Sequence, residues 1–323
     1  MYRIGIDLGG TNIAAGIVNE NFEIIAQDST PTLASRPGVE IVDDIAALCK
    51  KLCASIGVKT EEIASLGIAS PGTVDDETGY VLNAHNLNFF SFPIIPLLRE
   101  RLDIAEMHIA NDANAAAWGE AVAGAAKGSK SSVMITLGTG VGGGIIDNGK
   151  LFTGFNSAAG ELGHVVIQVG GRPCTCGRRG CWETYSSATG LIVTTKEKLA
   201  ECEKEGRKTL MTDIAAERGK VNGRTAFDAM RMGDEAAKEV VEEYVEYLAS
   251  GITSMINILQ PEVLSIGGGI SNEGQFLLDM VIPKVRAEQF AHETELPKTD
   301  IRIAQLRNNA GIIGGAVLGF GND

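Results

Sequence analysis

The chain has 323 residues, with 28 lysines and arginines against 41 aspartates and glutamates, and therefore a formal net charge of −13. This acidic balance argues against a nucleic-acid-binding protein, because neutralising phosphates requires clustered cations. Hydrophobic residues at 44% and charged residues at 21% exclude the disordered and fibrous classes, and the length suffices for about two domains.

The start of the chain and its cysteines indicate the compartment. Strand-like residues follow Met1 directly, without the regions of a signal peptide, and no apolar run reaches the length of a membrane span. Three of the six cysteines lie within residues 174–181, a spacing that suits a metal ion better than disulfide bonds. We therefore expect a cytoplasmic protein with no membrane segment.

The first half of the chain is predicted to be an α/β unit that begins with an antiparallel meander. A helix follows, because apolar residues from Val39 to Ile56 recur at spacings of three and four. The predicted elements are strands 2–6, 13–18 and 22–27, helix 39–56, strands 65–69 and 107–110, and helix 113–126.

The second half repeats this order. The predicted elements are strands 132–137 and 144–146, a strand after Gly149, a helical block over 184–259, strands 263–266 and 301–305, and a closing helix at 310–320. The similarity of the halves indicates an internal duplication. We expect two α/β lobes around a cleft, residues 1–117 and 118–305, with a closing helix within about 306–322 packed back on the first lobe.

Glycine accounts for 40 residues, and two glycine-rich turns follow Asp7 and Leu137. The second turn, residues 138–143, matches G-x-G-x-x-G, but a strand follows it where a dinucleotide site requires a helix. Each turn presents backbone N–H groups and a hydroxyl, from Thr11 or Thr139, with no Cβ to obstruct a phosphate. Either turn alone can be an ordinary hairpin; together they favour phosphate binding.

Three further features lie where strands end. Asp7 either caps its turn or holds a hydrated Mg²⁺ near phosphates. The glycines at 267–269 form a plain strand-to-helix turn or admit a nucleotide base or ribose. Asn111 and Asp112 cap an alanine-rich helix, and Asp112 is also placed to accept a proton from a substrate hydroxyl.

The most specific pattern is one histidine and three cysteines, His164, Cys174, Cys176 and Cys181. These complete a tetrahedral Cys₃His set, and four protein ligands leave no open position, so the zinc ion is expected to be structural. The alternative is three unligated cysteines. Glu161 and Glu183 flank the ligands and would serve as acceptors for sugar hydroxyls, or else as solvated surface acids.

Several motifs together resemble the ROK family of sugar kinases and repressors, most closely its zinc-containing bacterial glucokinases. The motifs, in chain order from residue 4 to about 320, are Asp7-Leu8-Gly9-Gly10-Thr11, Ser70-Pro71-Gly72, Asn111-Asp112-Ala113-Asn114, Leu137-Gly138-Thr139-Gly140-Val141-Gly142, Glu161-Leu162-Gly163-His164 and Cys174-Thr175-Cys176-Gly177-Arg178-Arg179-Gly180-Cys181-Trp182-Glu183.

The resemblance implies an α/β, actin-like ATPase fold and transfer of the γ-phosphoryl of ATP to the 6-hydroxyl of glucose. It implies ATP, Mg²⁺ and a structural Zn²⁺, with Asp112 as catalytic base. The implied sugar contacts are Gly72, Asn86, Asn111, Asp112, Glu161, His164 and Glu183. The implied nucleotide contacts are Asp7, Gly9, Gly10, Thr11, Asn12, Thr139, Gly140, Gly268, Gly269 and Asn272. The implied metal ligands are His164, Cys174, Cys176 and Cys181.

Two departures from the family pattern bear on specificity. Residues 86–90 read Asn-Leu-Asn-Phe-Phe, where many members carry Asn-Leu followed shortly by Trp. The first strand starts within five residues of Met1, whereas repressors carry a helix-turn-helix before it, so we expect a kinase. Another hexose, such as N-acetylmannosamine, N-acetylglucosamine, mannose or fructose, is the nearest alternative, and a non-catalytic sugar sensor is the alternative from another class. We also expect a homo-oligomer, dimer or tetramer.

Overall fold

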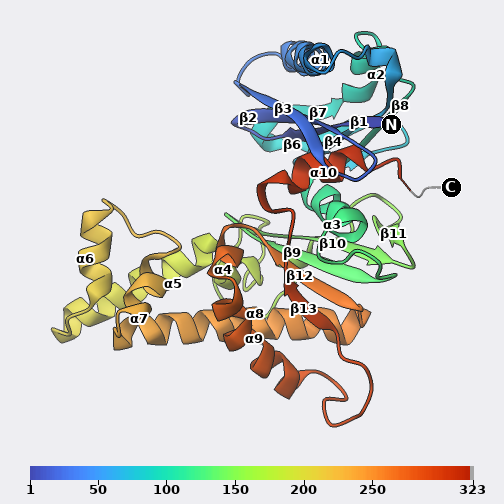
Figure 1. Ribbon diagram of the computed structural model, residues 1–323. Helices are drawn as coiled ribbons and strands as arrows, with labels where there is room; N and C mark the ends of the chain where they lie inside the picture. The colour runs from blue at the N-terminus through green and yellow to red at the C-terminus, as the bar shows by residue number, and fades with distance from the viewer. Residues whose placement is uncertain (321–323) are drawn as a thin grey trace. The chain divides into compact units, whose positions relative to one another are not determined.

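The computed structural model describes residues 1–320 and divides the chain into two compact units, each described here by itself (Figure 1). Unit 1 comprises Met1–Met134, Gly144–Gly160 and the described residues from Ala304 onward. Unit 2 comprises Ile135–Gly143 and Glu161–Ile303.

Unit 1 is built on a five-stranded sheet. Its strands are β1 (Tyr2–Leu8), β2 (Asn12–Val18), β3 (Ile24–Pro31), β4 (Ile63–Ser70) and β8 (Glu106–Asn111), in the order β3-β2-β1-β4-β8. The pairs β1–β2 and β2–β3 are antiparallel, as the predicted meander requires, whereas β4 pairs in parallel with both β1 and β8. The carboxyl ends of β1, β4 and β8 therefore share one edge.

Helices cover both faces of this sheet, with α1 (Gly38–Ser55) on one face and α10 (Ala310–Ala316) on the other (Figure 1). The predicted apolar stripe of α1, including Ile41, Ile45 and Cys49, is buried against the strands. Helix α10 approaches the sheet backbone closely because Gly5 and Gly67 lack a Cβ; an added Cβ would lie 1.7 Å from Ile312 O and 2.0 Å from Gly315 O, respectively.

A second, three-stranded sheet of unit 1 was not predicted. It consists of β5 (Thr73–Asp75), β6 (Tyr80–Ala84) and β7 (Phe89–Phe92), in that order, and is followed by α2 (Ile94–Arg99). These elements are short and are separated by residues with positive φ, Gly79 (φ 72°) and Asn88 (φ 55°). Strands this brief leave too few residues for an alternating pattern to show.

The later strands have the same arrangement as the first sheet. They are β9 (Ser132–Leu137), β10 (Val141–Asp147), β11 (Lys150–Leu151), β12 (Val263–Gly267) and β13 (Asp300–Ile303), in the order β11-β10-β9-β12-β13. As in the first sheet, the first three strands in sequence are adjacent in reverse order and the fourth lies beyond the first. This agrees with the internal duplication read from the sequence.

The helical block of unit 2 comprises five helices, and a sixth follows β12. They are α4 (Glu183–Ser186), α5 (Ala188–Glu205), α6 (Leu210–Glu217), α7 (Thr225–Arg231), α8 (Glu235–Leu259) and α9 (Gln275–Glu288), of which α9 was not predicted. Ser187, Thr209 and Asp234 cap α5, α6 and α8 through their side chains. The long helix α8 packs against α5, α7 and α9 along its buried stripe (Figure 1).

Short 3₁₀ helices complete the described chain. They are η1 (Thr60–Glu62), η2 (His85–Leu87), η3 (Leu162–His164), η4 (Gly269–Glu273) and η5 (Arg307–Asn309). Among residues 1–320, no helix combines the length and apolar character needed to cross a membrane.

The units do not divide at residue 117, where the sequence suggested a boundary. Helix α3 (Asp112–Ala123) lies wholly in unit 1, where Trp118 Nε1 donates to Val317 O at 2.7 Å. Buried Glu120 also accepts hydrogen bonds from the N–H groups of Gln305 and Leu306. These bonds tie the C-terminal segment to α3, and unit 1 is assembled from three separate segments of the chain.

Candidate active site and metal centre

The carboxyl edge of the first sheet gathers the predicted residues of unit 1. Asp7 on β1 is paired in register with Ala69 on β4, and Ser70 is paired with Asn111 on β8. The residues that follow these strands therefore emerge side by side. In open α/β sheets, this edge is where ligands bind.

Asp7 is half-buried at this edge, and its carboxylate interacts with that of Asp112, the first residue of α3. Burial, followed by repulsion from Asp112, raises the pKa of Asp7 above its ordinary value. Helix α10 passes directly over it, since a Cβ on Gly311 would lie 2.5 Å from Asp7 Cγ. The arrangement concentrates negative charge at one place, which is an environment that a divalent cation would stabilise.

The turn after Asp7 is held in place by Thr32, the residue that follows β3. Thr32, which is fully buried, donates its hydroxyl to Gly9 O at 2.6 Å and its N–H to Thr11 O at 2.8 Å. Gly9 N donates to Asn12 O at 2.9 Å and closes the turn. The structure thus places Gly9, Gly10, Thr11 and Asn12 in one tight loop beside Asp7.

Asn86 and Gly72 reach the same edge from the three-stranded sheet. A Cβ on Gly10 would lie 3.4 Å from Asn86 Nδ2, so the turn and Asn86 are neighbours. Asn111 Nδ2 donates to Gly72 O at 3.0 Å. Gly72 has φ 84° and no room for a Cβ, which would meet Asn83 O at 2.0 Å.

Asn111 also caps α3, as one interpretation of the sequence anticipated. Its Oδ1 accepts from Ala113 N at 2.9 Å and from Asn114 N at 3.2 Å. Asp112 is exposed at the first position of the helix. The N-terminus of a helix is a favourable position for an acidic side chain.

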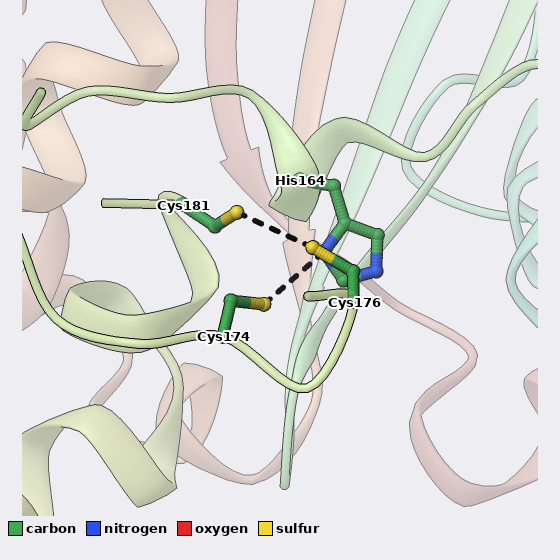
Figure 2. A group of neighbouring side chains, drawn as sticks. All are labelled: His164, Cys174, Cys176 and Cys181. Carbon is green, nitrogen blue, oxygen red and sulfur yellow. Dashed lines mark hydrogen bonds between the residues drawn. The ribbon is translucent and has the colours of Figure 1, made fainter. Parts of the chain in front are cut away.

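In unit 2, the four predicted metal ligands lie together (Figure 2). One donor atom from each of His164, Cys174, Cys176 and Cys181 lies within 4.8 Å of the others. Cys174 Sγ is 3.6 Å from His164 Nδ1, and Cys176 Sγ is 3.6 Å from Cys181 Sγ. The sequence prediction of this cluster is confirmed.

These separations fit a tetrahedral zinc ion. Bond lengths of about 2.3 Å to sulfur and 2.0 to 2.1 Å to nitrogen imply ligand-to-ligand distances of about 3.6 to 3.8 Å. Burial raises the pKa of Cys181 to about 12, while the N–H of Arg178 lowers the pKa of Cys176. A bound cation offsets the cost of a buried thiolate, so this cluster is suited to hold a metal ion.

The two acidic residues beside the cluster have different neighbours. Glu161 Oε2 lies 3.8 Å from His164 Nε2, so the histidine turns one ring nitrogen toward the sulfurs and the other toward a carboxylate. Glu183 Oε2 accepts from Val141 N at 3.1 Å, and its Oε1 lies 3.7 Å from Cys174 Sγ. Glu183 therefore joins the metal cluster to the turn after β9.

The end of β9 and the strand end after β12 are in contact. A Cβ on Gly140 would lie 2.2 Å from Glu183 Oε2, and one on Gly268 would lie 2.6 Å from the backbone of Leu137. Gly268 has φ 80°, which favours glycine. Asn272 Nδ2 donates to Gly269 O at 3.0 Å and fixes the beginning of η4.

The predicted residues thus form two groups, one in each unit. Unit 1 brings together Asp7, Gly9, Gly10, Thr11, Asn12, Gly72, Asn86, Asn111 and Asp112. Unit 2 brings together Thr139, Gly140, Glu161, His164, Cys174, Cys176, Cys181, Glu183, Gly268, Gly269 and Asn272.

Sequence reasoning missed two residues that hold the turns. Thr32 lies at a strand end with no motif around it, and only the tertiary structure reveals its bonds to the first turn. Thr189 donates its hydroxyl to Thr139 O at 2.7 Å. This bond, to a residue 50 positions earlier, likewise appears only in the tertiary structure.

Replacing Asp7 by Asn is expected to raise the unfolding temperature of the protein at about pH 8. The raised pKa means that the folded protein holds this proton more tightly than the unfolded chain, so the ionised carboxylate costs folding free energy above that pKa. The gain should shrink as the pH falls through the folded pKa toward the unperturbed value of 3.8. Thermal unfolding by circular dichroism across this range measures both effects.

Asp28→Asn is the matched control. Asp28 pairs with Lys51 on the surface of unit 1, and this partner lowers the pKa of Asp28, so its amide variant should not be stabilised. A lower unfolding temperature for Asp7→Asn than for the unmodified protein at about pH 8 would contradict the interpretation.

Protein purified without chelator is expected to contain one zinc ion per chain by elemental analysis. Cys181→Ser should lose the ion and unfold at a temperature lower by roughly 5 °C or more, because metal binding is coupled to folding. Cys202→Ser, which changes a buried cysteine of α5 outside the cluster, should retain the ion. Absence of zinc from the unmodified protein, or its retention by Cys181→Ser, would show the assignment to be wrong.

Comparisons with known proteins show the family of the chain. The family model described as the ROK family matches residues 3–320. A glucokinase of Halalkalibacterium halodurans is 37% identical over 318 residues, covering 98% of this chain and 94% of that protein. An N-acetylmannosamine kinase of Citrobacter koseri is 30% identical over 323 residues, covering 100% of both. The crystal structure of a ROK family glucokinase from Streptomyces griseus in complex with glucose and AMPPNP has a TM-score of 0.79 and 32% identity, covering 98% of this chain and 99% of that one. The chain therefore belongs to the ROK family, and it has the actin-like ATPase fold of the family's sugar kinases.

Proposed function

We propose that this hexose kinase phosphorylates the 6-hydroxyl of glucose, with ATP as the phosphoryl donor. The observation that carries the proposal is the pair of carboxylates, Asp7 and Asp112, beside the tight glycine turn at the carboxyl edge of one sheet. Glucose is favoured over other hexoses because the glucokinase relative is 37% identical and the N-acetylmannosamine kinase relative is 30% identical.

Asp112 is proposed as the general base. Its exposed carboxylate at the start of α3 is able to accept the proton of the sugar hydroxyl as that oxygen attacks the γ-phosphorus in line. Asn111 holds the start of the helix through its two bonds to backbone N–H groups, and Asp112 Oδ1 itself accepts from Ala113 N at 2.8 Å, so the carboxylate is held before substrate binds. This preorganisation is what a transfer reaction without a covalent enzyme intermediate requires.

Asp7 is proposed to hold a hydrated Mg²⁺. When bound, the ion supplies positive charge to the phosphate oxygens. The raised pKa of Asp7 shows that its surroundings already disfavour an uncompensated carboxylate. A cation at this position would lower that cost and reduce the repulsion between Asp7 and Asp112.

The turns are proposed to bind the phosphates and the nucleotide. Residues 9–12 and 138–141 carry backbone N–H groups next to glycines, and Gly269, beside Gly268, has open space for close approach of a ligand. Asn12, Thr139 and Asn272 are the polar side chains assigned to the same task.

The remaining predicted residues are proposed as sugar contacts. They are Gly72, Asn86, Asn111, Glu161, His164 and Glu183, in addition to Asp112. His164 suits two roles, because Nδ1 faces the sulfur ligands while Nε2 faces Glu161. A histidine held by a metal ion presents its second nitrogen in a fixed direction.

Replacing Asp112 by Asn should lower kcat by roughly 10² to 10⁴-fold, because it removes the proton acceptor and leaves the side chain's size unchanged. Glucose binding by titration calorimetry and the unfolding temperature should change little. Asp103→Asn, an exposed residue of unit 1 before β8, is the control and should keep full turnover. Near-normal turnover in Asp112→Asn would refute the assignment of the base.

A panel of sugars in a coupled assay for ADP formation tests the choice of substrate. We expect kcat/KM for glucose to exceed that for N-acetylmannosamine, N-acetylglucosamine, mannose and fructose by about tenfold or more. A preference for an N-acetyl sugar would replace glucose as the substrate. If no sugar raises ADP formation above the background rate, the result would instead support a sugar sensor.

A further inference from the structure

The turn after β9 is held on one side by the segment that follows the metal cluster. Ala188 N donates to Gly138 O at 2.9 Å, and Thr189 Oγ1 donates to Thr139 O at 2.7 Å. At the far end of the turn, Val141 N donates to Glu183 Oε2 at 3.1 Å. Two consecutive carbonyl groups of the turn therefore point toward the beginning of α5.

Because a peptide group is planar, the two carbonyl contacts also set the direction of the N–H group that follows each carbonyl. In a trans peptide, the carbonyl and the following N–H point in opposite directions. Because Gly138 O and Thr139 O face α5, the N–H groups of Thr139 and Gly140 face away from it. Within residues 1–320 neither N–H has a hydrogen-bond partner in the structure. Two adjacent, outward N–H groups form a concave site for an anion.

The two carbonyl contacts differ in how they depend on the sequence. The bond from Ala188 comes from backbone and persists whatever side chain stands there. The bond from Thr189 comes from a hydroxyl on an exposed side chain at the second position of α5. Without that hydroxyl, the Thr139 carbonyl loses its contact with α5, and among the described residues only the bond from Gly138 N to Gly140 O at 3.0 Å restrains the direction of the Gly140 N–H.

We propose that Thr189 is a positioning residue for the phosphates of the nucleotide. Its hydroxyl fixes the Thr139–Gly140 peptide and so aims the Gly140 N–H at a phosphate oxygen. The assignment rests on the proposed kinase function. It differs from a structural role, because the Thr189 side chain is exposed and its removal leaves no cavity in the core.

The test compares Thr189→Val with Thr189→Ser. Valine has the same shape without the hydroxyl, so the KM for ATP should rise by about fivefold, the effect of losing one hydrogen bond. The KM for glucose should stay within about twofold of the value for the unmodified protein, and the unfolding temperature within about 2 °C. Serine restores the donor and should return the KM for ATP to within about twofold.

Thr195→Val is the matched control. Thr195 lies on the same helix and donates its hydroxyl to Leu191 O at 2.7 Å, so the change removes a similar bond that does not touch the turn. Its KM for ATP should be unchanged. An equal KM for ATP in Thr189→Val and Thr195→Val would overturn the positioning role. So would a Thr189→Val variant in which the KM for ATP, the KM for glucose and the unfolding temperature all worsen together.

Calorimetric titration with MgADP separates this inference from the proposed function. If the unmodified protein phosphorylates no hexose, the kinase proposal fails, yet a weaker affinity for MgADP in Thr189→Val than in Thr195→Val still supports the positioning role. If the unmodified protein does not bind MgADP, both proposals are wrong.

Discussion

Helix α10 lies so close to the first sheet that a Cβ on Gly5 would sit 1.7 Å from a carbonyl oxygen of the helix. The contact depends on glycine in both β1 and β4, and it brings the start of α10 over Asp7. Unit 2 depends on the same kind of approach, since a Cβ on Gly163 would lie 2.1 Å from Val141 O. The excess of glycine is thus a packing requirement as well as a feature of the turns.

Strand order explains why there are two glycine turns. In each sheet the first two strands in sequence are adjacent, so the turns after Asp7 and after Leu137 occupy equivalent places in a duplicated arrangement. The two copies have diverged in what supports the turn. Thr32 holds the first from the end of β3, whereas Thr189 and Glu183 hold the second from the region after the metal cluster.

Much of this arrangement could be predicted from the sequence. The antiparallel meander, the apolar stripe of α1 and the Cys₃His cluster each have a strong local pattern, and the structure confirms all three. The β5-β6-β7 sheet and α9 left no pattern long enough to detect. Thr32 and Thr189 were out of reach for another reason, because their roles arise from hydrogen bonds to residues 23 and 50 positions away.

The segment from Cys181 to Thr189 connects a metal ligand, the carboxylate of Glu183 and the hydroxyl of Thr189 within a short stretch of mainly helical chain. One residue added to or removed from a helix rotates every later side chain by about 100°. A length change within α4 would leave Cys181 in the Cys₃His cluster and shift Thr189 away from the second turn. This segment therefore acts as a spacer of fixed length between the cluster and the second turn.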